Sequence, residues 1–245
     1  LLEKYVRVEP RLIILLGNPA WVLLSETIDR RWHGVPVLLC AEKETVGPAE
    51  IYLEKRVASG NSEVALKDYA GDIPLSVFYA PYYVKETLEL IAAVVPNMSK
   101  LVFLSDNRWI SAQCRKEVEE VMTAKFPQVL LDCLIAEEVT NDALVDSLKA
   151  SDSATAVLFL SWQKEEQQGN SILTSNISRL LSHYSNSPIF TLHNNATEDN
   201  GLIGGCFWSD SEIKEHLLPV IRSCLDEPHP QGVRVVTMGT PRPVI

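Results

Sequence analysis

Amide, carboxylate, guanidinium and aromatic side chains gather directly after the short apolar runs of this sequence. Flat rings can stack on a ligand and forked polar groups can fix its orientation, so these residue types together indicate a binding site for a small polar molecule. A sugar or a nucleoside-like compound has the required mixture of polar edges and apolar faces. The candidate ligand-binding residues are Asn18, Trp21, Glu42, Tyr82, Tyr83, Asp106, Arg108, Trp109, Trp162, His193 and Asn194.

Several of these residues have an alternative role in the fold. Trp21 and Trp162 could close the hydrophobic cores at the ends of their strands. Tyr82 and Tyr83 open a predicted helix, where one of two adjacent rings usually packs inward, so we expect only one of them to reach a ligand. Asp106 precedes an amphipathic helix and could cap its N-terminus instead.

Motifs of catalysis and of metal or phosphate binding are absent from the sequence. It contains no GxSxG, HExxH or GxxxxGK[ST] pattern, and its five histidines are isolated from one another. Glu137 and Glu138 are adjacent, and adjacent side chains diverge in direction and seldom form a catalytic pair. We therefore expect a non-catalytic domain without a metal or cofactor.

Composition narrows the class of protein further. At 245 residues the chain is long enough for two modest domains, and 46% hydrophobic with 22% charged residues is ordinary for a globular protein. A net charge of −10 without a basic stripe argues against nucleic acid as a partner. No run reaches the roughly 18 apolar residues of a membrane span. The five cysteines are scattered and odd in number, so we expect them to be free and mostly buried.

Apolar runs alternate with segments of helical periodicity along the chain, and hairpin signals are few. This order is typical of a parallel α/β sheet, in which ligands bind at the carboxyl ends of the strands. Predicted strands cover residues 12–16, 35–40, 75–79, 101–105, 129–135, 156–161, 188–193 and 203–208, and predicted helices cover 20–32, 83–95, 109–125, 140–150, 172–184 and 209–226. Residues 41–72 are charged and contain glycines, so we expect a surface excursion with a short helix near 49–55.

One segment contains a helix, a proline-marked connection, a buried strand, a polar loop and a second helix in succession. It is YAPYYVKETLELIAAVVPNMSKLVFLSDNRWISAQCRKEV, residues 79–118. The other strand and loop segments are RLIILLGNPAWVLL, PVLLCAEK, AVLFLSW, PIFTLHNN and GLIGGCFWSDSEIKEHLLPVIRSCLDEPHP. In this order they cover most of the chain, which resembles the periplasmic-binding-protein-like (type I) sensor domains of bacterial hybrid two-component histidine kinases.

The resemblance implies an α/β fold of two lobes, each with a parallel sheet flanked by helices. The implied limits are residues 1–98 with 196–228 for the first lobe, 99–195 for the second lobe, and 229–245 for a C-terminal tail that returns to the second lobe or hinge. The implied connections between the lobes are residues 96–100, 194–201 and 227–232, which are rich in Pro, Gly or Asn. The family's usual N-terminal strand, helix and second strand have no counterpart here, so the first sheet should have an exposed apolar edge.

The function implied by the resemblance is signal transduction. The chain would be the extracytoplasmic, periplasmic ligand-sensing domain of a two-component sensor histidine kinase, with a small polar ligand bound between the lobes and lobe closure as the signal. The full-length protein would be membrane-anchored and a homodimer, with first-lobe surfaces at residues 20–32 and 41–72 in contact. Two alternatives stay open: an ABC-type solute-binding protein for uptake of a small molecule, and an interaction module that binds no small ligand.

Overall fold

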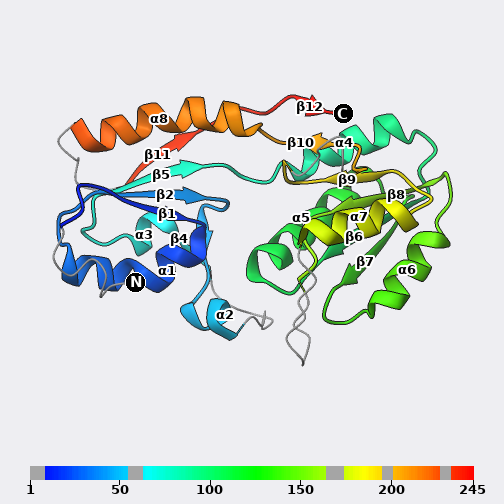
Figure 1. The fold of residues 1–245 in the computed structure, drawn as a ribbon, viewed down its shortest axis with the longest axis horizontal. Coiled ribbons are helices and arrows are strands. Elements are labelled where there is room, and N and C mark those ends of the chain that lie inside the picture. The colour runs from blue at the N-terminus through cyan, green and yellow to red at the C-terminus, as the bar shows by residue number, and fades with distance from the viewer. Residues whose placement is uncertain (1–8, 55–62, 164–173, 195–200, 227–232) are drawn as a thin grey trace. The chain divides into compact units, whose positions relative to one another are not determined.

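The computed structural model describes residues 9–54, 63–163, 174–194, 201–226 and 233–245 (Figure 1). The chain divides into two compact units, of which unit 1 contains Leu1–Pro81 and Asp210–Gly239, and unit 2 contains Tyr82–Ser209 and Thr240–Ile245. Each unit is built on a four-stranded sheet whose paired strands are all parallel. The predicted α/β class, with parallel sheets flanked by helices, is therefore confirmed.

Unit 1 has the strand order β1-β2-β5-β11. These strands are β1 (Ile13–Leu16), β2 (Val37–Ala41), β5 (Leu75–Tyr79) and β11 (Val233–Thr237), and the remaining elements are α1 (Asn18–Arg31), β3 (Thr45–Val46), α2 (Ala49–Glu54), β4 (Val64–Ala65), α3 (Leu66–Tyr69) and α8 (Asp210–Asp226). Figure 1 shows α1 and α8 on opposite sides of this sheet. The central strands β2 and β5 are almost continuously apolar because both of their faces are covered.

The edge strand β1 leaves apolar side chains uncovered in unit 1. Leu15 packs into the core beside α1, whereas Ile14 is 44% exposed and Leu16 is 74% exposed. Successive residues of a strand point to opposite faces, so Ile14 and Leu16 lie on the face away from α1. On that face α8 packs against β2 and β5. The predicted exposed apolar edge of the first sheet is present at β1.

Unit 2 has the strand order β7-β6-β8-β9. These strands are β7 (Leu130–Ile135), β6 (Lys100–Ser105), β8 (Thr155–Phe159) and β9 (Ile189–Thr191), and the remaining elements are α4 (Val84–Val94), α5 (Trp109–Lys125), α6 (Asn141–Lys149), α7 (Thr174–Tyr184) and the antiparallel pair β10 (Gly205–Cys206) and β12 (Pro243–Val244). One hydrophobic core lies between the sheet and α4 and α5, and a second lies between the sheet and α6 and α7. The sheet is thus covered on both faces.

The helix α4 belongs to unit 2, although the predicted limits placed residues up to 98 in the first lobe. Its apolar residues Val84, Leu88 and Ile91 share a core with Leu101 and Phe103 of β6. The proline at the end of the helical pattern marks the turn into β6 and not the passage from one unit to the other. The apolar face of α4 decides its place, because that face is buried against the sheet that comes after it in the chain.

The C-terminal tail also differs from the prediction. Residues 233–237, predicted as a tail along the second lobe or hinge, form β11 and pair in parallel with β5 in unit 1. Only the last part, β12, pairs with β10 in unit 2. The alternating pattern VRVVT supports a strand, while the two late prolines affect only the residues after that strand. The predicted connection at 227–232 lies outside the described residues, as does most of that at 194–201.

Candidate ligand-binding site

Three polar residues follow the strands of unit 2 at one edge of its sheet. Because β6, β8 and β9 are parallel, their carboxyl ends meet at the same edge, where α/β sheets bind ligands. Asp106 follows β6, Ser161 follows β8 by two residues, and His193 follows β9 by two residues. This edge therefore brings together residues that are far apart in the sequence.

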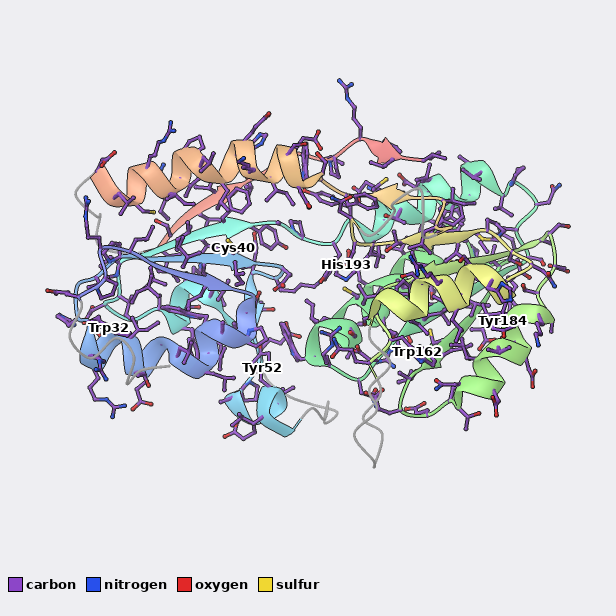
Figure 2. The ribbon with its side chains drawn as sticks, in the orientation of Figure 1. Trp32, Cys40, Tyr52, Trp162, Tyr184 and His193 are labelled. Carbon is purple, nitrogen blue, oxygen red and sulfur yellow. The ribbon has the colours of Figure 1, made fainter. Side chains whose placement is uncertain are left out.

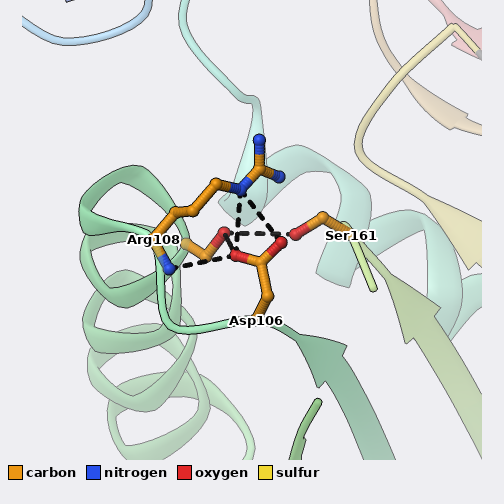
Figure 3. Close-up of polar contacts among 4 residues, drawn as sticks. Asp106, Arg108 and Ser161 are labelled. Carbon is orange, nitrogen blue, oxygen red and sulfur yellow. Dashed lines mark hydrogen bonds and ion pairs between the residues drawn. The ribbon is translucent and has the colours of Figure 1, made fainter. Parts of the chain in front are cut away.

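Asp106 is fully buried at this edge and is held by several donors (Figure 3). The Nε of Arg108 donates to Oδ1 at 3.1 Å and to Oδ2 at 2.9 Å, and the backbone N–H of Arg108 donates to Oδ1 at 3.1 Å. The hydroxyl of Ser111 donates to Oδ1 at 2.6 Å and lies 3.1 Å from the Ser161 hydroxyl. These contacts join the end of β6, the first turn of α5 and the end of β8 into one network.

The environment of Asp106 favours its charged form. Burial alone would raise the pKa of this carboxyl, but the hydrogen bonds from Arg108 and Ser111 and the positive charge of Arg108 outweigh burial and hold the pKa below its usual value. A buried carboxylate with this many donors stays ionised at neutral pH. Asp106 is therefore a fixed anchor for Arg108 and not a proton donor.

Arg108 is both anchored and accessible. Its side chain is 41% exposed, while that of Asp106 beneath it is 0% exposed. Arg108 occupies the N-cap position of α5, and no side chain caps the helix. The alternative that Asp106 caps this helix is therefore wrong. Its carboxylate instead accepts hydrogen bonds from Arg108, the N-cap residue, and from the side chain of Ser111 in the first turn. Figure 3 shows the two terminal nitrogens of Arg108 directed away from the carboxylate.

An aromatic pair lies near this network in unit 2. The ring of Tyr82 meets that of His193 edge to face, with centroids 4.8 Å apart. Burial first, and then the charge of Arg108, lower the pKa of His193 to about 4 against the opposing effect of Asp106. His193 is therefore neutral at pH 7, so it offers a ligand a polar but uncharged ring.

Tyr83 and Asn194 have different surroundings from their neighbours in the sequence. The hydroxyl of Tyr83 accepts a hydrogen bond from the indole N–H of Trp208 at 3.0 Å. Burial raises the pKa of Tyr83, although the bond from Trp208 acts in the opposite direction. Asn194 is exposed beyond the end of β9. Of the two adjacent tyrosines, Tyr82 is thus the one that lies against His193.

The two tryptophans predicted from unit 2 are core residues. Trp109 is 3% exposed at the start of α5. Trp162, labelled in Figure 2, is 1% exposed and packs with the side chains between the sheet and α6 and α7. The alternative role considered for Trp162, closure of a hydrophobic core, describes its position. We do not propose either ring as a ligand contact.

The predicted residues Asn18, Trp21 and Glu42 of unit 1 have structural roles: Asn18 and Glu42 connect the start of α1 to the chain after β2, and Trp21 is a core residue. The side-chain oxygen of Asn18 accepts from the backbone N–H of Glu42 at 3.0 Å and of Lys43 at 3.4 Å, and its nitrogen donates to the carbonyls of Lys43 at 2.8 Å and Thr45 at 2.9 Å. A Glu42 oxygen lies 3.4 Å from the backbone nitrogen of Asn18, where a negative charge favours the start of α1. Trp21 is 0% exposed in the core beside them.

Two hydroxyls of the unit 2 network are absent from the predicted set of site residues. Ser111 lies five residues after Asp106, a spacing that brings a side chain in the first turn of the helix close to the loop before that helix. Ser161 ends an apolar run at the same edge. The spacing from Asp106 could have indicated Ser111, but the contact between the two hydroxyls depends on the pairing of β6 with β8.

Metal-binding clusters and membrane-spanning helices are both absent from the described part of the chain. Within residues 9–54, 63–163, 174–194, 201–226 and 233–245, no group of three or more His, Cys, Asp or Glu side chains is placed to hold a metal ion. No helix in these ranges is long and apolar enough to cross a membrane. All five cysteines are free, as predicted, and burial raises the pKa of Cys133 to about 11.

Several solved structures have a similar fold. A tryptophan-bound ABC domain from Streptococcus pneumoniae has a TM-score of 0.60 at 13% identity, covering 98% of this chain and 72% of its own. The periplasmic binding protein of an arabinose ABC transporter from Shewanella scores 0.58 at 9% identity, with coverage of 98% and 74%. A conserved domain protein from Vibrio cholerae scores 0.59 at 12% identity, with coverage of 97% and 71%.

The chain thus has the α/β fold of the type I periplasmic binding proteins. No protein-family model matches the sequence, and no curated protein matches it. At these identities the likeness shows the fold alone, so the function has to be argued from the residues at the edge of the unit 2 sheet.

Proposed function

We propose that this protein binds a small polar molecule without transforming it, and that the carboxyl edge of the unit 2 sheet makes part of the binding site. The observation that carries the proposal is the anchored guanidinium of Arg108, which a buried, ionised Asp106 holds at the point where three parallel strands end. Burying a carboxylate is costly unless it is well paired. The network that fixes Arg108 at the strand ends therefore favours recognition of a polar ligand by this side chain.

A role in solute uptake agrees best with this proposal. The tryptophan-bound ABC domain and the arabinose transporter component are binding proteins of the same fold, and each carries its small ligand in the solved structure. The protein would work outside the cytoplasm as an ABC-type solute-binding protein. The closure of two lobes around the ligand stays a prediction.

The sensor domain of a two-component histidine kinase is the second candidate. The sequence resemblance in residues 79–118 and in the strand segments favours it. A sensor of this kind needs contacts between two copies that change on ligand binding. Leu23 and Leu24 are exposed on α1 in unit 1 and could take part in a homodimer. Sedimentation velocity over a concentration series, with and without ligand, tests this, and a strict monomer throughout would contradict the dimer.

A thermal-shift screen tests the binding function itself. The purified protein is heated with neutral sugars, nucleosides, L-amino acids and aliphatic carboxylates, each at about 1 mM. A ligand of micromolar affinity should stabilise the protein by about 4 kcal/mol, because stabilisation equals RT ln(1 + [L]/Kd). Heat release in calorimetry then confirms each hit. If no compound of any class shifts the transition while the protein self-associates, the binding function is wrong and an interaction module is favoured.

The complete gene separates the two candidates. A sensor requires a histidine kinase region in the same polypeptide, whereas a carrier for uptake requires a transporter that accepts the loaded protein. Phosphorylation of the full-length protein that changes with ligand would support the sensor. Ligand uptake that is lost on deletion of the gene and restored by the intact gene would support the carrier.

A further inference from the structure

The guanidinium of Arg108 bonds the described residues through its Nε atom and not through its two terminal nitrogens. A guanidinium has five N–H donors in a rigid plane, and only the single Nε–H bonds Asp106. Every hydrogen bond and ion pair of the Arg108 side chain with the described residues is made through this atom. Four N–H donors on the two terminal nitrogens therefore have no acceptor in the described part of the chain.

The acceptors of the network, in contrast, are already occupied. Oδ1 of Asp106 receives Ser111, the backbone N–H of Arg108 and its Nε, and Oδ2 receives the same Nε. A sugar needs acceptors for its hydroxyl protons as well as donors for its oxygens. Asp106 has little acceptor capacity left, and it is fully buried. The exposed part of this network thus consists mainly of donors.

Arg108 places a positive charge near the ring of His193. At the ring of His193, the charge of Arg108 contributes more than the opposing charge of Asp106. The neutral His193 adds no further charge, and its ring and that of Tyr82 form an aromatic surface close by. Arg108 also begins the 17-residue helix α5, whose N-terminus adds a partial positive charge.

We propose that the ligand carries a carboxylate, which binds the two terminal nitrogens of Arg108 as a forked pair. The planar fork of a guanidinium matches the two oxygens of a carboxylate, and Asp106 orients that fork before the ligand arrives. The aromatic surface of Tyr82 and His193 suits an apolar group attached to the carboxylate. The inference rests on the proposed binding function and narrows its ligand from sugars and nucleosides to small carboxylic acids, including amino acids.

The first test compares acids with their amides on the unaltered protein. Calorimetry measures the binding of L-amino acids and aliphatic or aromatic carboxylates, of the matching primary amides, and of neutral sugars. We expect at least one carboxylate to bind and its amide to bind at least about 10-fold more weakly, since a charged hydrogen-bonded pair is lost. If a sugar or an amide binds at least as tightly as the tightest-binding acid, the carboxylate inference is wrong and the binding function still holds. Absence of binding by all classes would overturn both.

The second test changes the arginine. Arg108→Gln should weaken the carboxylate by about 10- to 100-fold, and Arg108→Lys should not fully restore it, because a lysine keeps the charge for Asp106 but lacks the fork. Arg115→Gln on the same helix makes the same change of charge and should leave the affinity within about 2-fold. Circular dichroism and the melting temperature establish that each variant is folded. An Arg108→Lys variant that is folded and binds the acid as tightly as the unaltered protein would contradict forked recognition.

Discussion

The turn from β1 to α1 in unit 1 and the turn from β6 to α5 in unit 2 both follow the carboxyl end of a parallel strand, but they differ in how their polar groups are used. The Asn18 side chain at the first turn forms all of its hydrogen bonds with the backbone of residues 42–45. Asp106 at the second turn accepts hydrogen bonds from Arg108 and Ser111, and the terminal nitrogens of Arg108 stay accessible. One turn fastens a loop, and the other presents a charged group.

The difference shows that position at a strand end does not define a binding residue. The deciding factor is whether the neighbouring loop returns over the turn. In unit 1 the backbone after β2 accepts hydrogen bonds from the side-chain amide of Asn18. In unit 2 the groups that bond Asp106 come from the start of α5 itself, so the terminal nitrogens of Arg108 form no hydrogen bond with the described residues.

The largest effect is expected for Asn18→Ala in unit 1. The substitution removes the partner of four backbone groups, so the free energy of unfolding should fall by about 2 to 4 kcal/mol. Asn107→Ala is the matched control at the other turn, because the Asn107 side chain makes no hydrogen bond with the described residues. It should cost less than about 0.5 kcal/mol. Urea denaturation followed by tryptophan fluorescence measures both, and equal costs would remove the contrast between the turns.

The next effect is a pH dependence of stability in unit 2 that comes from His193. The pKa of about 4 in the folded protein lies below the usual value near 6.5, so the unfolded chain binds the proton first as the pH falls. Stability is unaffected above about pH 7 and should fall by about 2 to 3 kcal/mol between pH 7 and pH 4.5.

The variant His193→Gln isolates this effect. Asp106, Arg108 and the remaining charged groups are common to both proteins, so the difference in slope between them belongs to His193. Urea denaturation of the two proteins at pH 7, 6, 5 and 4.5 gives the comparison. Parallel curves over the whole range would show that His193 titrates in the folded protein much as it does in the unfolded chain.

The smallest effect separates two buried serines, Ser105 at the end of β6 and Ser111 in the first turn of α5. Ser111→Ala should lower the free energy of unfolding by about 1 to 3 kcal/mol, because the buried Asp106 carboxylate loses a donor. Ser105 is equally buried, and its hydroxyl has no hydrogen-bond partner among the described residues. Ser105→Ala should therefore change stability by less than about 0.5 kcal/mol or increase it slightly. A larger loss for Ser105→Ala than for Ser111→Ala would contradict the assigned network.

The periodicity of the sequence determined most of the fold. Predicted strands and helices agree with β1, β2, β5 to β9, α1 and α4 to α8 within a few residues, since the apolar runs and stripes are long and regular. The short strands β3, β4 and β12, the short helix α3 and the strand β11 were missed, and the predicted strand at 203–208 is reduced to Gly205–Cys206. Strands of two residues carry too little pattern to detect. The unit to which α4 belongs depends on which sheet buries its apolar face, and residue type does not specify that.

For the binding site, the sequence determined the residue types and their place after the strands, because the end of an apolar run can be read locally. Only the tertiary structure decided what each residue does. Asn18, Trp21, Trp109 and Trp162 are buried, whereas Ser161 meets Ser111, which bonds Asp106, because β6 pairs with β8. The contact between the Ser111 and Ser161 hydroxyls joins segments 50 residues apart, and no local pattern predicts such a contact.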